Sequence, residues 1–353
     1  MFRIGLNPYG IAYSVGLFGA GTPRANPKPL GLNGFLKVVE KFGLAGVEIP
    51  VSLLKDVQGA EADRIRERIH AGNRYAILMH GIPWGDLDGS LDIAKRFQFP
   101  IVRLHLTAVL CGARSLNAHA YASDAINDWP RLLADARKQL KAYARKAEHA
   151  GIGVTIEDHQ DLTSSELIEI CQECGSNVGV CLDTGNPLSV GEDPVEFAKA
   201  VGPWVRHVHL KDYRVFKQVQ GYRLVRCAIG DGEIPLRSIA DALASKGALP
   251  ASIEPGALEA RYIRLLDEKW WTHYPRRDAQ SLALCMQRVW PRMKQEELER
   301  TPWETDGTPA EIINYEREQF RASLLNLYNW FHPENDPDFE RLRRIQAFSN
   351  WED

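Results

Sequence analysis

The sequence lacks the features that mark secreted, membrane and nucleic-acid-binding proteins. No apolar run approaches the roughly 18 residues of a membrane span, and the amino-terminal MFRIGLNPYG has no charged and apolar signal regions. Six cysteines in 353 residues do not make a disulfide framework, which favours a cytoplasmic location. The net charge of −3 and the pI near 6.4 give no footprint for nucleic acid and no reason to expect membrane attraction.

Two short motifs lack the surroundings that a functional interpretation requires. GLFGAG at 16–21 is glycine-rich, but it does not directly follow a strand pattern and no proper helical pattern follows it. We therefore do not interpret it as a dinucleotide-binding loop. Cys171 and Cys174 form CQEC within a helical pattern, with no second pair at zinc-finger spacing, so we interpret both as structural.

Short apolar runs alternate with amphipathic stretches along most of the chain. The runs predict strands at 2–7, 46–49, 75–80, 101–106, 153–158, 178–183, 205–210 and 251–254. Helical patterns lie between them, and several end at a glycine just before the next strand. Repeated strand–helix units predict a parallel sheet, and eight of them are enough to close an α/β (β/α)8 TIM barrel. We prefer the barrel to an open doubly wound sheet.

The pattern changes after about residue 296. We divide the chain into a (β/α)8 barrel catalytic domain at 1–296 and a C-terminal helical extension at 297–353. We interpret 221–234 as a long loop at the C-terminal face of the barrel, where active sites of this fold lie. The extension predicts a homo-oligomer or hetero-oligomer surface, because it is rich in aromatic residues. These are Trp303, Tyr315, Phe320, Tyr328, Trp330 and Phe331.

Four predicted strands end in residues that commonly bind metals. Strand side chains alternate between faces, so Val154 and Ile156 share the face that meets the helices and Glu157 faces inward. The same alternation directs three further strand-end residues inward: Asp183, His209 and Glu254. Three carboxylates and an imidazole in one cavity would be unfavourable without a cation. This set suits Mn²⁺ or Mg²⁺, with Co²⁺, Fe²⁺ and Zn²⁺ as alternatives.

The stretches VTIEDH, CLDTGN, HVHLKDY and SIEPG follow one another in this order. They resemble the xylose-isomerase-like TIM-barrel superfamily of sugar isomerases and epimerases, over about residues 1–296. The resemblance implies a divalent metal, most readily Mn²⁺, and four ligands: Glu157, Asp183, His209 and Glu254. In the ketose 3-epimerase branch two glutamates also exchange the substrate proton from opposite faces, so the resemblance implies that Glu157 and Glu254 are catalytic.

This chemistry predicts a metal-dependent sugar isomerase or epimerase that acts on a small sugar, keto-sugar or sugar derivative. A divalent ion stabilises the enediolate that forms when an α-proton leaves, and a nearby carboxylate can take and return that proton. The same intermediate serves related lyases, which decarboxylate 3-oxo-sugar acids or cleave 3-oxo-C-glycosides as one subunit of a complex. A non-catalytic scaffold is less favoured because all four ligands are present. An endonuclease-IV-like nuclease is disfavoured by the acidic pI and by Asn186.

Several polar residues near the strand ends are candidates for substrate binding. Asn186 stands where the epimerases often carry a histidine, and Arg214 is the candidate for their substrate-binding arginine. The full set is His80, His105, His159, Asn186, Lys211 and Arg214. Each also has a structural interpretation as a satisfied polar residue.

Four further residues have a structural interpretation beside a functional one. Glu48, near the end of the second strand, either faces the cavity or packs in the core. Trp84 is interpreted as a packing residue in preference to a wall for a sugar ring. His207 shares the inward face of its strand but lies one layer deeper, so we interpret it as a hydrogen-bonded core histidine. Arg261 is assigned to the helix that follows the last strand.

Overall fold

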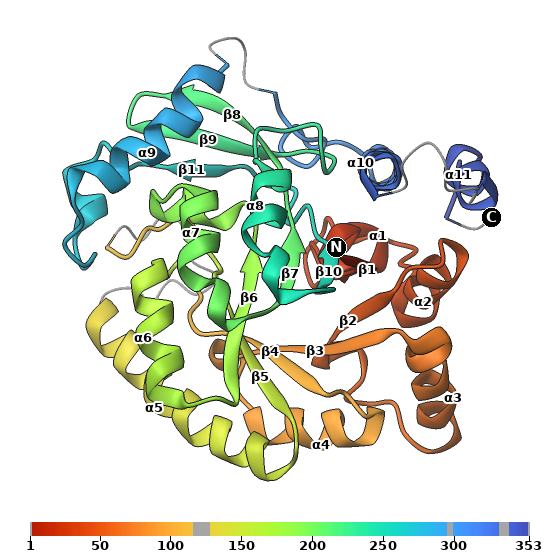
Figure 1. Cartoon of the computed structure of the whole chain (residues 1–353). Coiled ribbons are helices and arrows are strands. Elements are labelled where there is room, and N and C mark those ends of the chain that lie inside the picture. The colour runs from red at the N-terminus through yellow and green to blue at the C-terminus, as the bar shows by residue number, and fades with distance from the viewer. Residues whose placement is uncertain (1, 116–127, 295–298, 332–338, 352–353) are drawn as a thin grey trace.

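The computed structural model describes residues 2–115, 128–294, 299–331 and 339–351 of the chain. Eight parallel strands close into a barrel in the order β1-β10-β7-β6-β5-β4-β3-β2 (Figure 1). They are β1 (Arg3–Leu6), β2 (Gly46–Pro50), β3 (Tyr75–Gly81), β4 (Ile101–His105), β5 (Gly153–Glu157), β6 (Val178–Asp183), β7 (Val205–Leu210) and β10 (Pro250–Ile253). The predicted TIM barrel is confirmed, because each of these strands overlaps one of the predicted runs.

Helices surround the barrel on its outer side (Figure 1). They are α1 (Ala12–Val15), α2 (Gly31–Lys41), α3 (Gly59–His70), α4 (Leu87–Phe97), α5 (Trp129–His149), α6 (Ser164–Cys174), α7 (Pro194–Val201) and α8 (Leu236–Ala242). Local sequence sets their starts. At α6 the Thr163 side chain accepts from the Glu166 backbone N–H, and the Glu166 side chain accepts from that of Thr163. This capping box satisfies donors that the first helical turn leaves without partners.

A three-stranded antiparallel sheet adjoins the barrel, where the sequence predicted a loop at 221–234 and a helix at Arg261. It contains β8 (Tyr213–Gln218), β9 (Gly221–Arg226) and β11 (Arg261–Ile263) in the order β11-β9-β8. The loop interpretation of 221–234 is therefore wrong for its first six residues, and Arg261 lies in a strand. Val215 and Leu224 are fully buried. β9 is buried along its whole length, and its Arg223 and Arg226 are buried too.

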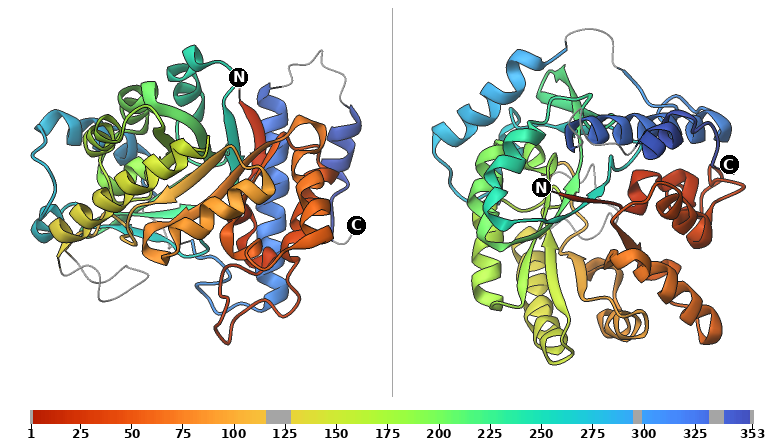
Figure 2. Two further views of the ribbon diagram at one scale, coloured as in Figure 1. Left: turned by 90° about the horizontal axis from the view of Figure 1, so that it is seen from below. Right: turned by 45° about the vertical axis from the view of Figure 1, so that its right-hand side comes forward.

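The last helices of the chain pack against the first helical units of the barrel. α9 (Ala279–Val289) lies near the antiparallel sheet, whereas α10 (Pro309–Phe331) runs beside α1 and is followed by α11 (Phe339–Gln346) (Figure 2). Glu316 on α10 is fully buried, and its carboxylate accepts from the backbone N–H groups of Tyr13 (3.0 Å) and Ser14 (2.8 Å). This helix therefore fixes the segment that follows β1.

The aromatic residues of the extension face largely inward. The Phe320 ring is fully buried and packs 5.6 Å from that of Phe42, and Tyr328 is buried too. The side chain of Phe331 lies outside the described residues. A partner surface on 297–353 thus remains a prediction that these buried rings do not support.

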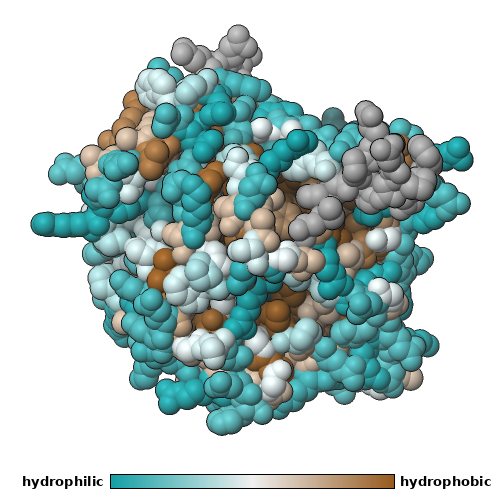
Figure 3. Space-filling model, in the orientation of Figure 1, coloured by the Kyte–Doolittle hydropathy of each residue, from teal (hydrophilic) through white to brown (hydrophobic). Residues whose placement is uncertain are grey.

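Hydrophilic residues cover most of the face shown in Figure 3, with apolar residues scattered between them. Among the helices that the structure describes, none combines the length and hydropathy of a bilayer span.

Candidate metal centre and active site

The four predicted ligands meet at the C-terminal ends of neighbouring barrel strands. Glu157 and Asp183 are the last residues of β5 and β6, and His209 on β7 pairs in register with Asp183. Glu254 follows β10, where its backbone N–H donates to the carbonyl of Leu210 (3.0 Å). One potential ligand atom from each of the four lies within 4.8 Å of the others, and all four side chains are buried. The closed barrel thus brings together residues separated by up to 97 positions in the sequence, from 157 to 254.

The geometry at these atoms fits a divalent cation. The Nδ1 of His209 lies 2.6 Å from Oε2 of Glu254 and 3.5 Å from Oε1 of Glu157. Within the described residues, neither that nitrogen nor Oε2 of Glu254 makes a hydrogen bond of good geometry, whereas Oδ2 of Asp183 lies against the Lys211 ammonium group. Buried polar atoms without partners are costly. Because two of them converge here, a cation bound between them would satisfy both together.

Glu48 on β2 orients the histidine of this set. The Nε2 of His209 donates to Oε2 of Glu48 (2.9 Å), and Asn7 donates to the same oxygen (3.3 Å). Burial raises the pKa of Glu48, but His209, His207 and Arg103 together lower it to about 2. In its neutral form, with the Nε2 proton held by this carboxylate, His209 would present the Nδ1 lone pair toward the other three predicted ligands. Metal-binding histidines commonly have such a partner.

One carboxylate oxygen of Glu157 faces His209, and the other is held by Arg103 and His105. Its Oε2 lies 2.8 Å from Nη1 of Arg103 and accepts from Nε2 of His105 (2.7 Å). Burial raises the pKa of Glu157, but Arg103 and the histidines lower it well below its usual range. Sequence reasoning missed Arg103. Its signal was available, because an arginine two residues before His105 in a buried strand shares the inward face.

Lys211 lies on the opposite side of the cluster. Its Nζ is 2.5 Å from Oδ2 of Asp183 and 3.5 Å from Oε1 of Glu254, and it donates to Oδ1 of Asn186 (3.5 Å). Burial lowers the pKa of Lys211, but Asp183 and Glu254 raise it well above its usual range. The lysine is therefore a buried cation that partly offsets three carboxylates.

A cavity of about 190 Å³ opens above these residues. It is smaller than the roughly 300–1,000 Å³ of pockets for drug-sized ligands, which suits a monosaccharide-sized molecule. Glu157, Glu254 and Lys211 line it, together with an aromatic wall. In that wall the rings of His105 and His159 stack at 3.9 Å, and the Trp84 ring lies 5.2 Å from that of His105. Burial lowers the pKa of both histidines, which favours their neutral forms.

The structure separates the six predicted substrate-binding residues into two groups. His105, His159 and Lys211 line the cavity, and Asn186 is buried beside Lys211. The other two lie elsewhere: His80 contacts the carbonyl of Gly85 at 2.5 Å, and Arg214 pairs with Glu299 of the segment after α9. We do not carry His80 and Arg214 into the proposed site. Arg261 and Trp84 line the cavity instead, and Trp84 is 51% exposed.

Two relatives match parts of the chain. The uncharacterized protein YihM of Escherichia coli is 30% identical over 100 residues, which cover 28% of this chain and 31% of that protein. The chain thus matches less than a third of that relative's length. The 3-oxo-isoapionate decarboxylase of Pectobacterium atrosepticum is 21% identical over 211 residues, covering 58% of this chain and 70% of the relative.

Solved structures share the fold. A D-psicose 3-epimerase with D-tagatose, from Clostridium cellulolyticum, has a TM-score of 0.57 and 15% identity, over 93% of this chain and 99% of that one. A xylose isomerase-like TIM barrel protein from Mycobacterium smegmatis, in complex with magnesium, has a TM-score of 0.54 and 16% identity, over 82% and 98%. A family model described as xylose isomerase-like TIM barrel matches residues 36–271. With that match and its closed barrel, the chain belongs to the xylose isomerase-like TIM-barrel family.

Proposed function

We propose that this protein is a divalent-metal-dependent enzyme that moves a proton beside the carbonyl group of a small sugar, keto-sugar or sugar derivative. Isomerisation or epimerisation is the outcome that we favour. The observation that carries the proposal is the convergence of Glu157, Asp183, His209 and Glu254 at the floor of a small cavity that both glutamates line. Mn²⁺ is our first choice of ion, because three of the four ligands are oxygen donors and one is nitrogen.

The bound cation would polarise the carbonyl and neighbouring hydroxyl oxygens and so stabilise an enediolate. The protein's own residues would move the proton. Glu254 has one oxygen 3.5 Å from Lys211, whereas the corresponding oxygen of Glu157 is held at 2.8 Å and 2.7 Å by Arg103 and His105. We therefore assign proton removal to Glu254, whose cavity-side oxygen is the less restrained. Glu157, supported by His105, would exchange the proton on the opposite face.

The remaining cavity residues suit a polyhydroxylated substrate. Lys211 offers a hydrogen-bonding ammonium group with Asn186 beside it, and the rings of Trp84, His105 and His159 offer an aromatic wall. Sugars present both kinds of surface. We place the enzyme in the cytoplasm, because all six cysteines are free thiols.

A solvent-exchange experiment tests the proposal. Metal-stripped protein is reloaded with Mn²⁺ and incubated in D₂O with a panel of ketoses and 3-oxo-sugar acids, and the products are analysed by NMR and mass spectrometry. We expect deuterium to enter a sugar without cleavage of its carbon chain. Glu254→Gln should abolish the exchange and Glu148→Gln, an exposed helical control, should retain it. Deuterium exchange that persists in Glu254→Gln, or that is unchanged after the metal is removed with a chelator, would refute the proposed mechanism.

Lyase chemistry is the second candidate. Arg261 lines the cavity together with Arg103 and Lys211, and a guanidinium group at the cavity wall suits a substrate carboxylate. The likeness to 3-oxo-isoapionate decarboxylase agrees with that class. Release of CO₂ from a 3-oxo-sugar acid, or of an aglycone from a 3-oxo-glycoside, would identify the lyase outcome. If Glu157→Gln and Glu254→Gln leave the protein's cellular role intact, it acts as a scaffold instead.

A further inference from the structure

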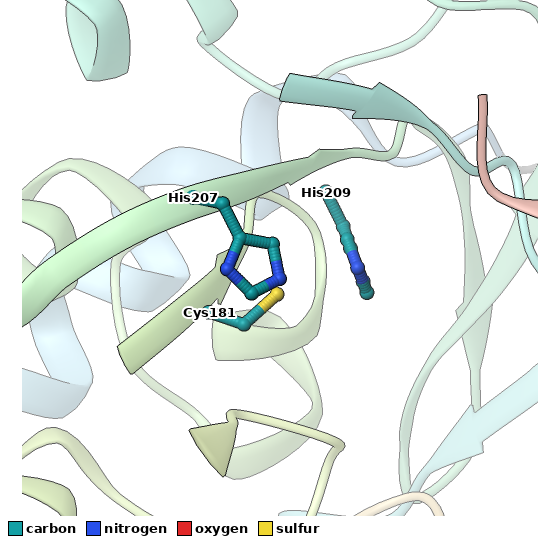
Figure 4. Close-up of side chains that lie close together, drawn as sticks. All are labelled: Cys181, His207 and His209. Carbon is teal, nitrogen blue, oxygen red and sulfur yellow. The ribbon is translucent and has the colours of Figure 1, made fainter. Parts of the chain in front are cut away.

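A second group of metal-ligand residues lies one layer deeper in the barrel. Cys181 on β6 pairs in register with His207 on β7, just as Asp183 pairs with His209 in the layer above. One potential ligand atom from each of Cys181, His207 and His209 lies within 4.8 Å of the other two. All three side chains are fully buried. Figure 4 shows the sulfur of Cys181 directed toward the two imidazole rings.

His207 has no hydrogen-bonded role in this layer. Neither of its ring nitrogens has a hydrogen-bond partner among the described residues, and its contact with His209 is between ring faces and edges, at 5.6 Å. The sequence interpretation of His207 as a buried core histidine holds, but the hydrogen bonds expected of it are absent among the described residues. A buried imidazole with both nitrogens unsatisfied is costly. An ion bound beside it would remove part of that cost.

We propose that Cys181, His207 and His209 form a second cation site, selective for soft divalent ions such as Zn²⁺ and Cd²⁺. One sulfur and two imidazole nitrogens are a ligand set typical of zinc. Thiolate ligands select softer ions than carboxylates do, whereas the layer above is rich in oxygen. The two layers therefore differ in the ions that they prefer.

His209 links the two sites and makes them compete. Its Nδ1 faces Glu254 and its Nε2 donates to Glu48. Whichever nitrogen binds an ion in the lower layer, the upper site loses either a ligand or the hydrogen bond that orients it. A soft ion in the lower site should therefore weaken Mn²⁺ binding above it. This competition rests on the proposed function of the upper site, but binding in the lower layer does not.

Cadmium is the probe for this site. Metal-stripped full-length protein is titrated with Cd²⁺, and the ultraviolet thiolate-to-metal charge-transfer band is recorded. In parallel, Mn²⁺ binding is followed by electron paramagnetic resonance, with and without Cd²⁺. We expect a band that saturates at one Cd²⁺ per chain. We also expect Cd²⁺ to lower the Mn²⁺ affinity at least about tenfold, because disturbing the groups that orient metal ligands commonly costs 10–100-fold in affinity. Cys181→Ser should abolish the band and the competition while retaining Mn²⁺ binding.

Two further variants keep the test decisive. Cys174→Ser should retain the band, because this thiol lies on α6, outside the barrel. His207→Gln should weaken Cd²⁺ binding by at least about tenfold, and it decides the matter if Cys181→Ser does not fold. The proposal is overturned if saturating Cd²⁺ produces no band in the unmodified protein, or if the band survives in Cys181→Ser or is lost in Cys174→Ser. A normal band without any Mn²⁺ binding would instead refute the upper site and support the lower one.

Discussion

Replacement of Glu48 should weaken metal binding, although Glu48 itself does not line the cavity. Its carboxylate holds the Nε2 proton of His209 at 2.9 Å, which leaves Nδ1 to face the other ligands. Loss of such a partner commonly costs 10–100-fold in metal affinity, or about 1.4–2.7 kcal/mol. Glu48→Gln keeps an oxygen that can accept the proton, so we expect a loss of about tenfold. Glu48→Ala removes the acceptor, and we expect about a hundredfold.

Calorimetric titration of metal-stripped protein with Mn²⁺ measures this effect directly. Glu148→Gln provides the control, because its side chain is exposed on α5. Circular dichroism should show that the variants stay folded, since Glu48 also lies 3.9 Å from Nε of Arg103. Equal Mn²⁺ affinities for the unmodified protein and Glu48→Ala would refute the orienting role of Glu48.

Three further predictions concern stability. Burial raises the pKa of Asp161 to about 7 from the ordinary 3.8, so the folded state favours the protonated carboxyl. The free energy of unfolding should therefore fall as the pH rises from about 4 to 7, by up to about 4 kcal/mol. Chemical denaturation with chelator across that range should show a flatter profile for Asp161→Asn, and parallel profiles would contradict the assignment. Mn²⁺ at about 100 times its Kd should raise the free energy of unfolding by about 2.7 kcal/mol, and a melting temperature indifferent to Mn²⁺ would argue against a metal bound only in the native state. Glu316→Ala should cost about 2–6 kcal/mol in urea unfolding, because two buried backbone N–H groups lose their acceptor; a loss under about 0.5 kcal/mol, typical of surface sites, would mean that α10 does not anchor the segment after β1.

Local patterns in the sequence were enough to predict the barrel and the clustering of the four predicted ligands. Strand alternation is a property of neighbouring residues, so the inward direction of Glu157 follows from Val154 and Ile156 without knowledge of the rest of the fold. The strand ends then meet because parallel barrel strands share one C-terminal face. These steps require no contact between distant residues to be known in advance.

The roles that sequence reasoning missed depend on contacts across the barrel. Glu48 and His209 are 161 positions apart, and nothing local to either one identifies its partner. Arg103 pairs with Glu157 from a neighbouring strand. The β8–β9 hairpin was missed for another reason. Charged residues interrupt the apolar residues of its strands, so Arg223 looked like part of a loop until its pairing with Phe216 placed it in a sheet.

A crystal of the Mn²⁺-loaded protein, with anomalous diffraction recorded at the manganese edge, tests the central claim most directly. We expect one strong anomalous peak within coordination distance of Glu157, Asp183, His209 and Glu254. A fully loaded crystal with no peak between those four side chains, or with its manganese bound elsewhere, would contradict the proposed metal centre.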